Sequence, residues 1–185
     1  MRLRTLQFFF VATAFCIPLS IYADMAVGGN YTLNLIDVDS NKLSTADGHI
    51  TVIVVTTSAD FEKARLVGDR VPEFCLGDPA YRMVTIVNFQ KRRSAPMRLF
   101  FAAVMRRRLD AEAKRLQPRY AAKKLARDPR RDVYAVADFD GTIVSRLGMS
   151  FESGVLRVFV FGRSGELLQQ WNDVPSAADL ASVVK

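Results

Sequence analysis

Three short apolar runs rich in β-branched residues constrain the fold of this 185-residue chain more than any other feature. His49–Thr57 contains Ile-Thr-Val-Ile-Val-Val, and Tyr81–Phe89 and Val133–Phe139 have the same character. Such runs are typical of strands that are buried on both faces of a sheet. Segments of helical character separate the runs, and strands joined through helices usually lie parallel with both sheet faces covered. The pattern therefore predicts an α/β sandwich with parallel central strands.

Shorter elements complete the predicted order. Asn30–Asp37 alternates polar and apolar residues, which predicts an edge strand, and the turn-forming residues Asp39–Lys42 follow it. Leu156–Phe161 and Glu166–Trp171 flank a glycine-containing turn and predict a β-hairpin. A last helix is expected to begin at Pro175.

Two longer helices are expected between the central strands. Ser58 is the predicted N-cap of the first, which runs to about Phe74 with an interruption at Pro72. The second covers about Ala95–Leu125, and Pro118 is expected to split it because proline removes a backbone donor and clashes with the preceding turn.

The first residues have the three-part organisation of a secretory signal peptide. Arg2 and Arg4 precede the apolar stretch Leu6–Leu19, and a polar boundary follows. We expect residues 1–23 to be a signal peptide cleaved after Ala23, which leaves residues 24–185 as one exported, periplasmic domain. An uncleaved membrane anchor is the alternative, although the apolar stretch is shorter than the roughly 20 residues of a comfortable span.

The order of elements resembles the thioredoxin fold. Asp138–Gly148 is similar to the Asp-x-x-Gly segment of peroxiredoxins and related thiol oxidoreductases, in which a strand ends in a turn and a short helix. Val158–Phe161 with Gly165 resembles the penultimate strand and its turn, and Val174–Ser176 resembles the start of the last helix. Over about Gly48–Lys185, the resemblance implies a thioredoxin-like three-layer sandwich. Its mixed sheet would end in a C-terminal β-hairpin and helix.

The chain departs from that family where its chemistry resides. Thioredoxin-type enzymes carry Cys-x-x-Cys, or one peroxidatic cysteine, at the junction of the first central strand and its helix. Here the junction is Thr56–Asp60, without cysteine, and no proline lies near Val155 or Leu156, where the family places a cis-proline. The sequence is similar to an exported thioredoxin-like family that lacks Cys-x-x-Cys. That resemblance implies a binding or accessory module without cofactor rather than an enzyme.

Cys75 would be the sole thiol once Cys16 leaves with the signal peptide, so no internal disulfide is expected. It is predicted at the C-terminal end of the first helix, where the helix dipole disfavours a thiolate. Its neighbours Phe74 and Leu76 indicate a buried, inert cysteine. The alternative function is that of a thiol reductase or peroxidase that uses Cys75.

Asp138-Phe139-Asp140-Gly141-Thr142 also fits the first motif of haloacid-dehalogenase-type phosphatases. The resemblance would make Asp138 the phosphoryl acceptor and Asp140 the acid/base beside magnesium. Only residues 143–185 follow, too few for the further strands of such a core, so an Asp-Gly turn at a strand end is favoured. His49 is the single histidine and gives little support for a metal site.

The formal charge of +7 is unevenly distributed. Between Lys91 and Arg131 there are 15 Lys and Arg against three acids, a net charge of +12. The rest of the chain after Ala23 then carries −7. Residues 91–131 are therefore predicted to form a basic helical insertion in an acidic fold.

Met97, Phe101, Met105 and Leu109 recur at four-residue spacing in this segment and predict an amphipathic helix. Two interpretations stay open: the helix packs its apolar stripe while its cations stay solvated, or the cations bind an anionic lipid surface or an acidic protein. Nucleic acid is not expected, because the chain is predicted to be exported and has no nucleic-acid motif. The candidate binding residues are Arg98, Arg106, Arg107, Arg108, Lys114, Arg115, Lys123 and Lys124.

Overall fold

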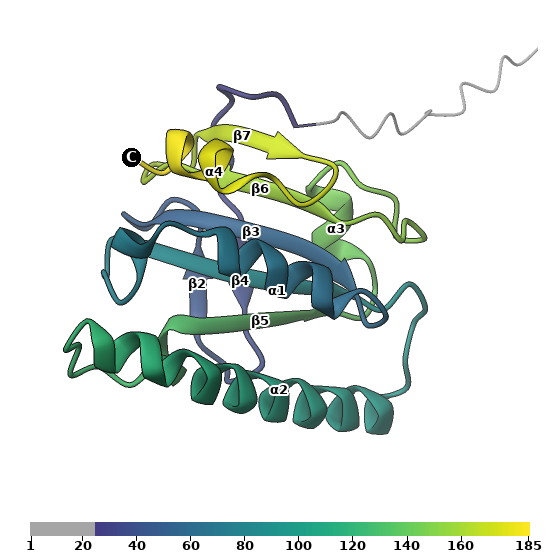
Figure 1. Cartoon of the computed structure of the whole chain (residues 1–185). Helices are drawn as coiled ribbons and strands as arrows, with labels where there is room; N and C mark the ends of the chain where they lie inside the picture. Colours follow the sequence, from purple (N-terminus) through teal and green to yellow (C-terminus); the bar gives the residue numbers. More distant parts are fainter. Residues whose placement is uncertain (1–24) are drawn as a thin grey trace, which may run out of the picture.

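A five-stranded mixed sheet forms the centre of the computed structural model, which describes residues 25–185 (Figure 1). The strand order is β5-β4-β3-β6-β7, with β3, β4 and β5 parallel and β6 and β7 antiparallel. The strands are β3 (Ile50–Thr57), β4 (Tyr81–Asn88), β5 (Val133–Asp138), β6 (Arg157–Phe161) and β7 (Leu167–Trp171). The predicted central strands and C-terminal hairpin are confirmed. The predicted signal peptide lies outside the described residues.

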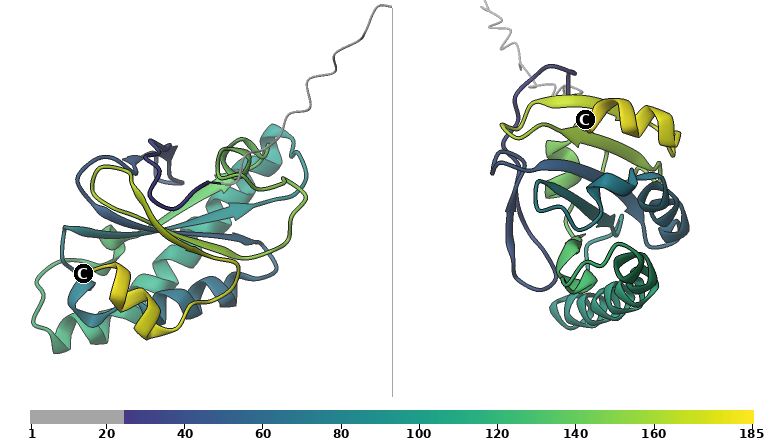
Figure 2. Two further views of the ribbon diagram at one scale, coloured as in Figure 1. Left: turned by 90° about the horizontal axis from the view of Figure 1, so that it is seen from above. Right: turned by 60° about the vertical axis from the view of Figure 1, so that its left-hand side comes forward.

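Helices and a small hairpin cover the two faces of this sheet (Figure 2). One face carries α1 (Phe61–Arg70), α2 (Ala95–Ala122) and α4 (Ala177–Val183). The other carries α3 (Thr142–Arg146) and the two-stranded sheet of β1 (Asn34–Ile36) and β2 (Lys42–Ser44). The predicted mixed α/β sandwich is thus confirmed.

Strand β3 has no exposed position among its eight residues. Ile53 and Val55 face the layer of α3 and the hairpin, while Val52 and Val54 face α1 and α4. A strand with two apolar faces has to be covered on both sides, because each face left in water would forfeit its hydrophobic stabilisation.

The prediction for Asn30–Asp37 is corrected by the structure. The segment is not an edge strand of the main sheet; β1 pairs with β2 in a separate sheet, in the register Leu35↔Leu43. The Asp37 carboxylate closes the intervening turn by accepting the backbone N–H groups of Asp39 and Asn41, at 2.9 and 2.7 Å. Leu35 and Leu43 then pack on the core.

Two helix predictions are also corrected. α1 begins at Phe61 rather than just after Ser58, because the chain turns first at Thr57 and Asp60 is the N-cap. α2 runs unbroken through Pro118, which is exposed to solvent. Buried side chains on both sides of the proline, Ala113 and Tyr120, continue the packed face, and this packing outweighs the lost backbone hydrogen bond.

The hairpin layer is fastened to the sheet by one buried arginine. Arg82 of β4 donates from Nη1 and Nη2 to both carboxylate oxygens of Asp47, each at 3.0 Å, and from Nη2 to the Ser44 carbonyl at 2.6 Å. Partial burial opposes ionisation of Asp47, but hydrogen bonds from Arg82 and His49 outweigh it and lower its pKa to about 2.

Replacing Asp47 with Asn should lower the free energy of unfolding at neutral pH by about 1–2 kcal/mol. The pKa of Asp47 is lower in the folded chain than its ordinary 3.8, so its stabilisation is complete above that value and is lost as the pH falls towards 2. Urea unfolding of wild type and variant at a series of pH values measures the difference. Glu166→Gln, which removes an exposed carboxylate, is the control; a difference independent of pH would contradict this assignment.

Candidate functional site

The junction between β3 and α1 is the place where thioredoxin-type enzymes carry their thiols. Here Thr57 and Asp60 close the turn: the Thr57 hydroxyl donates to the Asp60 carboxylate at 3.3 Å and accepts the Ala59 N–H at 3.3 Å. All peptide bonds of residues 25–185 are trans, including those around Leu156. The junction thus offers hydroxyls and a carboxylate, but no nucleophilic sulfur.

Cys75 lies near the opposite end of β3 from this junction. It is not at the end of α1, as predicted, because Pro72 follows that helix and Cys75 belongs to a separate 3-10 turn, Glu73–Cys75. Its side chain packs with Ile50, at the start of β3, and is 7% exposed. The predicted burial is confirmed. Burial raises the pKa of the thiol to about 11, with a further contribution from Asp78.

Asp138 and Asp140 shape the turn that leads from β5 into α3. The carboxylate of Asp138 accepts the N–H groups of Gly141, Ile143 and Val144 at 2.9, 3.1 and 2.9 Å. Its side chain is 1% exposed, and burial raises its pKa against the effect of these donors. Asp138 therefore caps α3 and is enclosed by the backbone.

Asp140 is exposed and accepts the Thr142 N–H at 3.1 Å. Its hydrogen bonds with the Thr142 side chain and backbone lower its pKa. Gly141 has φ of +80°, and a Cβ there would lie 2.6 Å from the Phe151 ring, so the turn requires glycine.

Half of the candidate binding cations hold α2 against its neighbours. Arg106 pairs with Asp39 at 3.4 Å and donates to the Val38 carbonyl. Three others make comparable contacts: Arg115 with Asp69 and Glu112, Arg108 over the Phe61 ring at 4.6 Å, and Lys123 with the Glu73 carbonyl. These side chains link α2 to α1 and to the loops beside it.

The remaining candidates face solvent or lie near the start of α2. Arg98 donates to the Arg93 carbonyl at 3.0 Å and lies 5.7 Å from the centroid of the Phe139 ring. Arg107, Lys114 and Lys124 are exposed and make no side-chain contact of this kind within the described part of the chain. Of the eight candidates, Arg106 and Arg115 are thus neutralised by carboxylates, and Arg98, Arg108 and Lys123 contact only carbonyls or rings.

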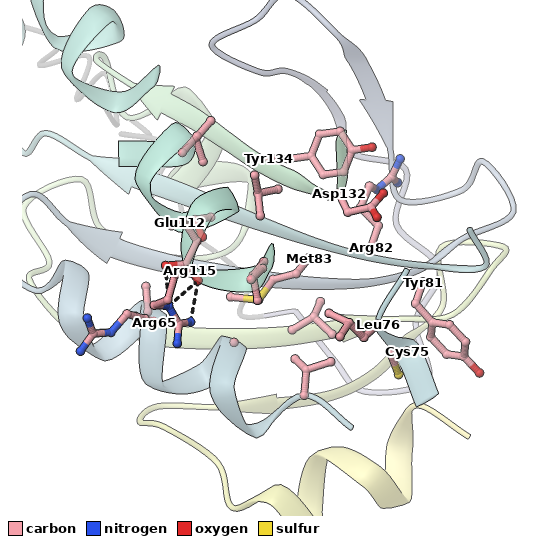
Figure 3. Close-up of a pocket in the computed structure, with 18 of the residues that line it drawn as sticks. Arg65, Cys75, Leu76, Tyr81, Arg82, Met83, Glu112, Arg115, Asp132 and Tyr134 are labelled. Atoms are coloured by element: carbon pink, nitrogen blue, oxygen red, sulfur yellow. Dashed lines mark hydrogen bonds and ion pairs between the residues drawn. The ribbon is translucent and has the colours of Figure 1, made fainter. Parts of the chain in front are cut away.

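A cavity that the sequence did not predict lies between α1 and α2, over β4. Its volume is about 610 Å³, within the usual range for ligand pockets. Figure 3 shows Met83 between the Arg115–Glu112 contact and Cys75. Its apolar lining includes Val52, Ala64, Val71, Leu76, Leu109 and Leu116. The one signal in the sequence was the pair of small residues Ala64 and Gly68, spaced to share one face of α1.

Ion pairs between the two helices cross the rim of this cavity. Arg115 of α2 reaches Asp69 of α1 at 2.7 Å and Glu112 at 2.6 Å, and these partners raise the pKa of the guanidinium. Arg119 pairs with Glu73 one turn further along. The helices are thus joined at the surface while the space beneath them stays open.

Comparison with solved structures identifies the architecture. StoA from Bacillus subtilis matches with a TM-score of 0.50 at 11% identity, over 85% of this chain and 99% of that one. The exposed lipoprotein thioredoxin Etrx1 from Streptococcus pneumoniae matches with a TM-score of 0.50 at 11% identity, over 83% and 98%. The chain therefore has the thioredoxin-like fold. Neither a protein-family model nor a curated protein sequence matches it.

Neither a cluster of metal ligands nor a membrane-spanning helix is found among residues 25–185. No group of three or more His, Cys, Asp or Glu side chains in this part is arranged to hold a metal ion. None of its helices combines the length and apolar character needed to cross a membrane.

Cys75 should react about a hundredfold more slowly with iodoacetamide in the folded protein at neutral pH than in urea, because a pKa raised from 9.0 to about 11 leaves a hundredfold less thiolate. Mass spectrometry of the peptide that contains Cys75 follows the labelling. Equal rates in the folded and unfolded chain would contradict the buried, protonated thiol.

Asp138→Ala should lower the free energy of unfolding by about 2–4 kcal/mol, because three backbone N–H groups lose their acceptor. Asp140→Ala removes one exposed acceptor and should cost about 0.5–1 kcal/mol. Chemical unfolding of the two variants gives the comparison. A smaller loss for Asp138→Ala than for Asp140→Ala would show that Asp138 does not hold the turn together.

Proposed function

We propose that this protein is an exported binding module of thioredoxin-like fold, without thiol redox chemistry, that docks on an anionic lipid surface through the start of α2. The leader-like residues 1–23 support export. The rival function, a thiol reductase or peroxidase, would have to use Cys75, because it is the one cysteine among residues 25–185.

The place of Cys75 argues against the redox function. Reactive thiols of this fold gain their low pKa from the N-terminus of the helix that follows the central strand. Cys75 follows that helix instead, is buried, and has a pKa raised to about 11. Burial and the nearby Asp78 both disfavour the thiolate that a reductase or peroxidase requires.

The observation that carries the proposed partner is a patch of exposed apolar and basic side chains, the Lys91–Phe100 tip. Met97, Leu99 and Phe100 are 40, 75 and 58% exposed. Lys91, Arg92 and Arg98 are exposed in the same segment, partly buried Arg93 lies over the Phe101 ring at 5.4 Å, and Phe89–Leu109 contains no acidic residue. Figure 1 shows α2 along the edge of the molecule, next to β5.

An anionic bilayer would satisfy both kinds of side chain. Apolar groups at such a surface enter the boundary of the acyl chains, and each nearby Lys or Arg contributes about 1 kcal/mol of attraction to anionic headgroups. An acidic protein would pair with the cations but gives no reason for three adjoining apolar side chains to be exposed. We therefore favour lipid over an acidic protein.

Leu99→Ser combined with Phe100→Ser should weaken binding to vesicles of mixed phosphatidylglycerol and phosphatidylcholine at least about tenfold, through lost apolar burial. Lys91→Glu with Arg92→Glu should have at least as large an effect, through repulsion from the headgroups. Vesicle co-sedimentation at low and high salt measures both, and wild-type binding should weaken with salt.

The charge-matched control is Arg163→Glu with Lys185→Glu. Arg163 follows β6 and Lys185 follows α4, so both lie at the edge of the sheet opposite the Lys91–Phe100 tip. This control should bind vesicles like wild type. If the control lost binding equally, the effect would come from net charge and not from the Lys91–Phe100 tip. Absence of vesicle binding at low salt would refute a lipid partner. The labelling of Cys75 would still decide the redox question in that case.

A further inference from the structure

The cavity between α1 and α2 is polar at its rim and apolar along its length. It follows β4 from Thr85, near the start of α1, to Tyr81, near Cys75. Val52, Met83 and Leu116 lie between these ends. A ligand with a long apolar chain would bury that chain against this lining, whereas a compact polar ligand would leave the lining in contact with water.

The charged groups of the lining are almost all paired within the protein. Arg65 pairs with Glu62 at 2.6 Å, and Arg82 with Asp47. The remaining pairs are Arg115 with Glu112 and Asp69, Arg119 with Glu73, and Asp132 with Arg127 and the Tyr120 hydroxyl. Asp78 accepts the Ala80 N–H at 2.8 Å.

Arg108 is the exception. Among residues 25–185 no carboxylate lies within ion-pair distance of its guanidinium, which rests on the Phe61 ring at 4.6 Å. Since Phe61 is the first residue of α1, this unneutralised charge sits at the Thr85 end of the cavity. A carboxylate placed there would gain a charge-assisted hydrogen bond.

We propose that this cavity binds one long-chain amphipathic anion, of the class of fatty acids, with its carboxylate at Arg108 and its chain along Met83 towards Cys75. The cavity volume of about 610 Å³ is adequate for such a chain. This inference is independent of the proposed docking surface, because it uses the space beneath the helices rather than the Lys91–Phe100 tip.

A larger side chain at position 68, where the chain has Gly68, would fill part of the cavity. A Cβ at this position would meet the Met83 sulfur at 3.5 Å, an ordinary contact, so a side chain can start there without a clash and then extends over the floor. Leucine is also a better helix former than glycine, so Gly68→Leu should keep α1 folded. Lys63→Leu adds the same side chain to the exposed face of α1 and serves as the control.

The experiment titrates the full-length protein with cis-parinaric acid, a fluorescent fatty acid, and displaces it with palmitate or with uncharged hexadecanol. We expect one saturable site, weakened at least tenfold by Gly68→Leu and unchanged by Lys63→Leu. Arg108→Gln should weaken binding of palmitate severalfold and leave hexadecanol unaffected, while Arg163→Gln changes neither.

Cys75 gives a second measurement that needs no substitution. Saturating palmitate should slow iodoacetamide labelling of Cys75 at alkaline pH severalfold, because the thiol lines the far end of the cavity. Absence of saturable binding, unaltered affinity in folded Gly68→Leu, or unprotected Cys75 would overturn the site. Equal dependence of palmitate and hexadecanol on Arg108 would overturn the role of the carboxylate.

Discussion

The burial of β3 on both faces is the constraint on which the other layers depend. β4 and β6 satisfy the hydrogen bonds at its two edges, and apolar side chains project from both of its faces. One face is covered by α1 and α4, and the other by α3 and the β1–β2 hairpin. Arg82 fixes the hairpin through Asp47, and Asp138 fixes the start of α3, so two buried charged groups hold that outer layer in position.

The protein has the thioredoxin-like fold without a thiol at the position where enzymes of that fold carry one. A thiol at the β3–α1 junction would lie at the N-terminus of a helix, but this chain places Thr57 and Asp60 there, and Cys75 lies near the opposite end of β3. A protein fold fixes the position of a site and not the residues that occupy it. Likeness to thioredoxin structures at 11% identity therefore describes the framework of this protein.

Folding partly neutralises the positive charge of residues 91–131. Acids distant in the sequence lie beside α2, as Asp39, Asp69 and Glu73 do, and they neutralise Arg106, Arg115 and Arg119. Cations without a carboxylate occur along the whole segment, but only at the start of α2 do they adjoin exposed apolar side chains, Met97, Leu99 and Phe100. The cross-links at the cavity rim also explain how α1 and α2 can leave space between them without separating.

The sequence by itself determined the central strands and the hairpin, because β-branched runs and glycine turns specify the local backbone. It also determined the burial of Cys75, because the neighbours Phe74 and Leu76 are apolar. Only the tertiary structure decided the unbroken helix at Pro118, the pairing of β1 with β2, and the cavity. Tyr120 is buried in the fold and Gly68 meets Met83, a residue distant in the sequence, while the packing of Leu35 and Leu43 on the core keeps β1 paired with β2. Arg115 is neutralised by its helix neighbour Glu112 and, through the tertiary structure, by Asp69, whereas Arg108 rests on the Phe61 ring and stays available to a ligand.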